Sequence, residues 1–318
     1  MDRDGNQHYE SKLNYQMFRL EGERLRKTEG AQELSELFPP GKEKEWPTLV
    51  LISKPAIVSP QVFFDCFTSA QAILPRVTDI DNDHAVYAGS YYGRGHLHAN
   101  IVDSIKRYRK LGSNPEDLST MTPGGELQAY QLLDILLARD EEGNVILEDK
   151  KPVLRPDAKN VLKHIIGYGY SAGHMANKDA FRVLRDMLGD GDVMIVTGQN
   201  EEGILQVRES CAADADKLLP NARLVGVAGM DRMDIPNPGM PREVDFLSPE
   251  EFTTATLGPR LIGAPNVIKL TMRDDEGKAI TDDVGGHAQS SYVRAILSSA
   301  NEKQCADARS KLASGLAR

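Results

Sequence analysis

Short apolar runs alternate with longer, partly polar stretches along most of the chain. The runs are rich in Val, Ile and Leu and are bounded by Gly, Pro or charged residues, which is typical of buried strands. We expect such strands at residues 48–53, 84–89, 165–170, 192–197, 223–228 and 266–271. Continuous apolar strands that alternate with helices predict an α/β fold, with a mostly parallel central sheet flanked by helices on both faces.

The stretches between these runs carry helical patterns. Apolar residues recur near a 3.6-residue period in residues 97–111, with Lys and Arg between them. Further helices are predicted at residues 60–72, 123–138, 158–164, 172–188, 204–219 and 288–299. Residues 8–37 are polar with scattered apolar positions, so we expect one or two surface helices there, ahead of the main body.

Composition and charge narrow the class of protein. Hydrophobic residues make up 40% and charged residues 27% of the chain, which is ordinary for a folded globular protein. The formal net charge of -9 argues against a nucleic-acid partner, because neutralising phosphates requires clustered Lys and Arg. We expect no cleavable signal peptide, because the first residues contain no basic region followed by an apolar run. We expect no transmembrane segment, because no apolar run approaches the roughly 18 residues needed.

The cysteines and histidines predict no metal site and no disulfide framework. Cys66, Cys211 and Cys305 are far apart and odd in number, so we expect reduced thiols and a cytoplasmic location. Export by a route that uses another signal stays open. His96 and His98 stand two residues apart, a spacing that does not face one site on a helix, and no further ligands stand near them.

One motif carries chemistry. Residues 169–173 read Gly-Tyr-Ser-Ala-Gly and match the G-x-S-x-G pattern of a nucleophile elbow, between an expected strand and an expected helix. Such a turn strains the backbone of Ser171, and small residues two positions away on either side avoid clashes. The N–H of Ala172, at the start of the helix, is placed to stabilise an oxyanion. The pattern predicts Ser171 as a nucleophile.

With this motif and this order of elements, residues 45–300 resemble the α/β-hydrolase superfamily. The resemblance implies a triad in the chain order nucleophile, acid, histidine. In the family the acid follows the strand two beyond the elbow strand, which our count places at 223–228. Asp231 is then the acid and Asp234 the alternative, and His287, after the final strand, is the histidine.

The resemblance also implies a second oxyanion donor. In this family it comes from the loop after the third strand. Ser90 and Tyr91 occupy that place in the expected order of elements.

These assignments predict a serine hydrolase that cleaves an ester or thioester through an acyl-enzyme, like a carboxylesterase or lipase. The expected partner is a small-molecule or lipid ester, no cofactor is expected, and a protein partner is left undefined. We expect an N-terminal helical extension at residues 1–44 and a catalytic domain at 45–318, with insertions near 112–155 and 232–262.

The sequence is also compatible with two alternatives. One is a hydrolase-fold binding or scaffold protein without turnover. The other is a nucleotide-binding doubly wound protein, with Gly89, Gly93 and Gly95 as its phosphate loop. That glycine spacing fits neither G-x-G-x-x-G nor G-x4-G-K-[ST], which disfavours the second alternative.

Overall fold

The computed structural model describes thirteen stretches of the chain. They are residues 16–21, 24–27, 34–53, 60–90, 123–141, 143–149, 151–189, 194–200, 203–208, 213–229, 239–249, 263–280 and 288–313.

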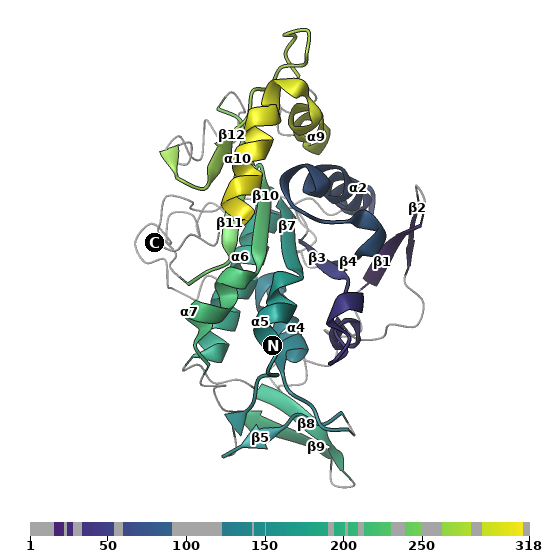
Figure 1. The fold of residues 1–318 in the computed structure, drawn as a ribbon, viewed down its shortest axis with the longest axis vertical. Helices are drawn as coiled ribbons and strands as arrows, with labels where there is room; N and C mark the ends of the chain where they lie inside the picture. The colour runs from purple at the N-terminus through teal and green to yellow at the C-terminus, as the bar shows by residue number, and fades with distance from the viewer. Residues whose placement is uncertain are drawn as a thin grey trace.

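A large sheet organises the structure (Figure 1). Its strand order is β12-β11-β10-β7-β3-β4-β1-β2. The strands from β12 to β4 are parallel to their neighbours, whereas β1 pairs antiparallel with both β4 and β2. Their bounds are β1 (Gln16–Glu21), β2 (Arg24–Lys27), β3 (Thr48–Ser53), β4 (Ala85–Ser90), β7 (Ile165–Tyr170), β10 (Arg223–Val227), β11 (Arg242–Leu247) and β12 (Val267–Lys269).

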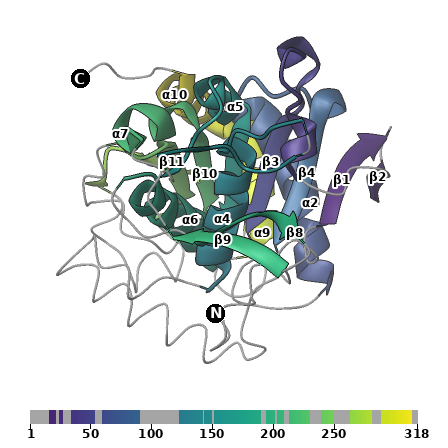
Figure 2. The same ribbon diagram turned by 90° about the horizontal axis from the view of Figure 1, so that it is seen from below.

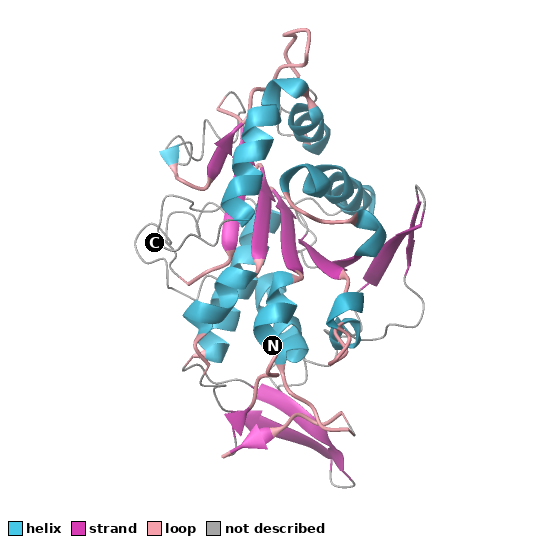
Figure 3. Ribbon diagram, viewed as in Figure 1, coloured by secondary structure: helices cyan, strands magenta, loops and turns pink. Residues whose placement is uncertain are grey.

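Helices cover both faces of this sheet, as expected for the α/β class (Figures 2 and 3). Alternate residues of β3, β4, β7 and β10 enter two separate apolar cores, because side chains of a strand point to opposite faces in turn. In β3, for example, Leu49 and Leu51 face one core, and Val50 and Ile52 face the other. The first core includes α4 (Pro123–Leu136), α5 (Ala158–Lys163) and α6 (Ala172–Leu188), and the second includes α2 (Pro60–Val77), α9 (Gln289–Leu297) and α10 (Glu302–Ala313).

Two small antiparallel pairs lie outside the large sheet. One joins β5 (Leu147–Glu148) to β6 (Lys151–Pro152), and the other joins β8 (Met194–Asn200) to β9 (Gly203–Arg208). Figure 1 shows β5, β8 and β9 together at the bottom of the view. The remaining short elements are η1 (Leu34–Leu37), η2 (Glu43–Glu45), η3 (Asn82–His84), α7 (Ala215–Leu218), η5 (Leu219–Asn221) and η7 (Ser299–Asn301).

The structure corrects the expected N-terminal helical extension. Residues 16–27 contain two strands, which extend the large sheet through the pairing of β1 with β4. Phe18 and Leu20 alternate with Arg19 and Glu21, a two-residue period that suits a strand and not a helix.

The expected strand at 192–197 and helix at 204–219 also need correction. The strand exists as β8, but it pairs with β9 outside the large sheet. Residues 204–208, expected to be helical, belong to β9, and the described helical residues of 204–219 lie in α7 and η5. Because only two residues separate β8 from β9, the two strands can pair only as an antiparallel hairpin.

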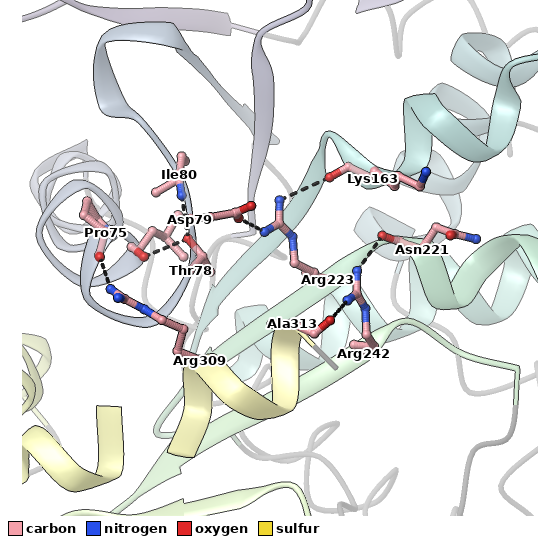
Figure 4. Close-up of polar contacts among 11 residues, drawn as sticks. Pro75, Thr78, Asp79, Ile80, Lys163, Asn221, Arg223, Arg242, Arg309 and Ala313 are labelled. Atoms are coloured by element: carbon pink, nitrogen blue, oxygen red, sulfur yellow. Dashed lines mark hydrogen bonds and ion pairs between the residues drawn. The ribbon is translucent and has the colours of Figure 1, made fainter. Parts of the chain in front are cut away.

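Near the amino-terminal ends of the parallel strands, arginine side chains bond α10 to α2 and to β11 (Figure 4). Arg309 on α10 donates to the carbonyls of Pro75 and Arg76, at 2.8 and 3.0 Å, near the end of α2. Arg242, at the start of β11, donates to Ala313 O at 2.9 Å and to Asn221 O at 3.2 Å. These bonds lie at the opposite edge from Ser171, so they support the fold and not the site.

No helix among the described residues is long and apolar enough to cross a membrane. Cys66 and Cys305 are buried and form no disulfide within the described part of the chain, whereas Cys211 lies outside it.

Candidate functional site

Ser171 occupies a strained turn between β7 and α6. Its φ of 53° and ψ of -125° lie in a region that side-chain-bearing L-residues rarely adopt. Its N–H donates to Val227 O at 2.9 Å, and its carbonyl accepts from the N–H of His174 at 3.1 Å. Both backbone groups of the residue are therefore held by neighbours, which keeps the strained conformation in place.

Glycine at position 169 allows α6 to approach β7. A methyl group added there would lie 2.5 Å from both N and Cα of His174, which is backbone that cannot swing aside. Gly167, two residues earlier, faces the side chains of Leu224 and Asn177, with a hypothetical methyl 2.6 Å from Leu224 Cδ2. The requirement for small residues before the serine, expected from the motif, is therefore met by a close helix contact.

The residues in register with Gly169 on the neighbouring strands form a row of small or polar residues across five strands. Gly169 is in register with Ser53 of β3 on one side and with Gly226 of β10 on the other. The row continues to Ser90 of β4 and to Asp245 of β11. The first turn of α6 lies over its middle, since a methyl on Gly226 would meet the His174 ring at 2.7 Å.

Charged side chains of α6 and β11 meet under that first helical turn. His174 Nε2 lies 2.7 Å from Glu243 Oε1, and Lys178 Nζ lies 3.2 Å from the same oxygen. The His174 side chain is fully buried, and those of Lys178 and Glu243 are nearly so. Buried charges are costly unless they are paired, and this arrangement pairs them.

Asp245 completes this buried cluster. Its Oδ1 accepts from the N–H of Gly229 at 3.1 Å, and its Oδ2 has no hydrogen-bond partner among the described residues. Burial raises the pKa of Asp245 to about 6, although the positive charge of His174 and the Gly229 bond oppose the rise. For His174, burial lowers the pKa, but the bond to Glu243 and the charge of Asp245 outweigh it, so the pKa is raised.

The structure describes only some of the predicted site residues. Ser171 and Ala172 adjoin at the turn, and the N–H of Ala172 belongs to the first helical turn, where N–H groups lack partners within the helix. Ser90 ends β4, and β3 separates β4 from β7, a span of about 10 Å between strands. Tyr91, Asp231, Asp234 and His287 lie outside the described residues, so their roles stay predictions.

The observed strand order changes the positions at which the family pattern predicts the acid and the second oxyanion donor. Because β8 is not in the large sheet, β10 is the strand next to β7, and the strand two beyond is β11. Asp231 follows β10, whereas the first carboxylate after β11 in the sequence is Glu250. The expected source of the second oxyanion donor, the loop after the third strand, changes as well. With β1 and β2 counted, the third strand is β3, which ends at Ser53, and Ser53 is in register with Gly169 of the elbow strand β7.

Sequence reasoning missed β11 and with it Glu243 and Asp245. The strand falls inside the 232–262 region that we expected to be an insertion. The two acidic residues interrupt the apolar run that marks the other strands, although Val244 and Phe246 alternate with them and enter the core. That two-residue alternation after Pro241 was the available signal.

Nothing in the described part of the chain gathers three or more His, Cys, Asp or Glu side chains in an arrangement that could hold a metal ion. His96, His98, Gly93 and Gly95 lie outside the described residues. Comparison of the chain with protein-family models, curated proteins and solved structures gave no match.

Proposed function

We propose that this chain is a serine hydrolase of the α/β-hydrolase type, which cleaves an ester or thioester with Ser171 as the nucleophile. The conformation of Ser171 carries the proposal. A serine with a φ of 53° at the junction of a central parallel strand and a helix is the arrangement that the elbow motif predicts. Strained backbone conformations of this kind cluster at functional sites.

The surroundings of Ser171 suit acyl transfer. The first N–H groups of α6 and the positive end of its dipole favour negative charge near the serine, as a tetrahedral intermediate requires. The predicted base, His287, would take the proton from Ser171 during attack on the carbonyl, and water would later release the acyl group. A base of this kind contributes about 10²–10⁴-fold to the rate.

Two other members of the site remain to be chosen by experiment. The acid is Asp231, which follows β10, or Glu250, which the observed strand order favours. The second oxyanion donor comes from Ser90-Tyr91 or from the chain that follows Ser53, which lies nearer the elbow strand. The substrate is a small-molecule or lipid ester, and the proposed chemistry needs no metal or cofactor.

A fluorophosphonate probe tests the proposal, because it reacts with activated serines. We expect the wild type and Ser310→Ala, a control at an exposed serine of α10, to be labelled, and Ser171→Ala to be unlabelled. His287→Ala should lower the labelling rate by about 10²-fold or more. An unlabelled wild type would leave a hydrolase-fold binding protein as the better interpretation.

The same variants resolve the acid and the substrate. Hydrolysis of p-nitrophenyl esters of increasing chain length gives the preferred acyl group. Of Asp231→Asn and Glu250→Gln, the one that lowers kcat identifies the acid.

A further inference from the structure

Two strained turns lie side by side at the proposed site. Ser171 donates its N–H to Val227 O, and the next residue, Ala228, has a φ of 52°. The turn at Ala228 is held by its own N–H, which donates to Phe246 O at 2.9 Å, and by the Gly229 bond to Asp245. The chain then leads to Asp231, two residues on.

The buried cluster of His174, Lys178, Glu243 and Asp245 contacts both turns. Through its backbone N–H, His174 holds the carbonyl of Ser171, and through its ring it bonds to Glu243. Asp245 holds the N–H of Gly229. Between the two, β10 offers only Gly226, whose missing side chain leaves space for the His174 ring and the Asp245 carboxylate. The cluster therefore connects the nucleophile turn to the turn after β10.

The charges in this cluster balance only when it holds one extra proton. Lys178 and Glu243 are paired at 3.2 Å, and the formal charges of these four residues balance when His174 and Asp245 together hold one proton. Burial raises the pKa of Asp245, whereas the pKa of His174 is raised against the effect of burial by the bond to Glu243 and the charge of Asp245, so both shifts favour retention of that proton. Losing it leaves these four buried residues with a net charge of about -1, which burial makes costly. His174 Nδ1 and Asp245 Oδ2 have no hydrogen-bond partner among the described residues, so no further bond there offsets the charge.

We propose that His174, Glu243 and Asp245 are positioning residues that hold the Ser171 turn against the turn after β10, and that loss of the cluster's proton slows the reaction at Ser171. This inference rests on the proposed function of Ser171. The groups that face His174 are Lys178 on its own helix and Glu243 and Asp245 on β11. In this proposal the cluster acts on the reaction through its bonds to the backbone of the two turns.

The test combines a reaction profile with a direct titration. The rate of fluorophosphonate labelling of Ser171 is measured against pH, together with the NMR titration of the ¹⁵N-labelled His174 ring, which His174→Gln assigns. We expect a bell-shaped plot of labelling rate against pH. The rate should rise as the base, His287, loses its proton and fall as the cluster loses its proton. Glu243→Gln keeps the acceptor oxygen but removes the charge, so the falling limb and the His174 titration should both move down by about 1 pH unit or more.

Controls separate positioning from a merely structural effect. His84→Gln removes an exposed histidine, paired with Asp81 in η3 and remote from the cluster, and should leave the bell unchanged. Asp245→Asn is the second variant, in case Glu243→Gln does not fold, and should move the falling limb in the same direction.

The outcomes are distinct for the two proposals. If the His174 titration moves while the falling limb stays, or if the wild type has no falling limb, the positioning inference is overturned and the nucleophile proposal stands. If the wild type is not labelled at all, the nucleophile proposal fails. In that case the backbone amide signals of Ala172 and Gly229 decide the inference, because they must both shift as His174 titrates.

Discussion

Removing the charge of Asp245 should stabilise the protein above neutral pH. Burial raises the pKa of this carboxyl group from its ordinary value of 3.8 to about 6. A group whose pKa is higher in the folded state contributes stability below its unfolded pKa and loses it as the pH rises through its folded pKa. Between about pH 4 and pH 7 the wild type should therefore lose stability through Asp245.

The size of this loss follows from the two pKa values. Each pH unit between them is worth about 1.4 kcal/mol, so the loss is about 3 kcal/mol in the free energy of unfolding. Asp245→Asn has no proton to lose, and its amide oxygen still accepts from Gly229 N–H. We expect the variant to show a flatter dependence on pH and to exceed the wild type in stability by about 2–3 kcal/mol near pH 8.

Urea unfolding near pH 5 and pH 8 measures both quantities. The single tryptophan, Trp46, is buried against Phe38 and His164, so its fluorescence reports unfolding of the core. Asp216→Asn is the matched control: its partner Arg185 is on the same helix as His174, but the pair is solvent-exposed and should change stability by less than about 1 kcal/mol. If Asp245→Asn is less stable than the wild type near pH 8, burial does not dominate at Asp245 and the reasoning fails.

Three further predictions concern the elbow and the last helix. Gly169→Ala forces a methyl to 2.5 Å from the His174 backbone. It should lower the free energy of unfolding in urea by about 1–3 kcal/mol and slow labelling of Ser171 by about tenfold or more. The control Gly263→Ala, with open space around the added methyl, should do neither. Ser171→Gly should be more stable than Ser171→Ala by about 1 kcal/mol, because only glycine adopts this backbone conformation without strain; equal stabilities would argue against a strained turn. Arg309→Ala removes two hydrogen bonds to the end of α2 and should cost about 1–2 kcal/mol in thermal unfolding while labelling of Ser171 remains, since the bonds lie at the far edge of the sheet.

The sequence by itself determined the elements whose signal is local. The interior strands β3 and β7 and the helix α6 have the bounds expected from their apolar runs and from the motif between β7 and α6. The strained turn at Ser171 belongs to this class, because the residues that require it are its own neighbours in the chain. The α/β class followed from the alternation of such elements, since apolar strands must be covered on both faces.

Tertiary structure alone decided which strands pair and what lies beneath the nucleophile turn. An apolar run shows that a strand exists but not its partner, so β8 was assigned to the wrong sheet, and the family position of the acid moved with it. Glu243 and Asp245 carry no local sign of burial, because a charged residue is acceptable in the interior only when a partner from elsewhere reaches it. That partner is His174, sixty-nine positions from Glu243 along the chain, and only folding brings the two together.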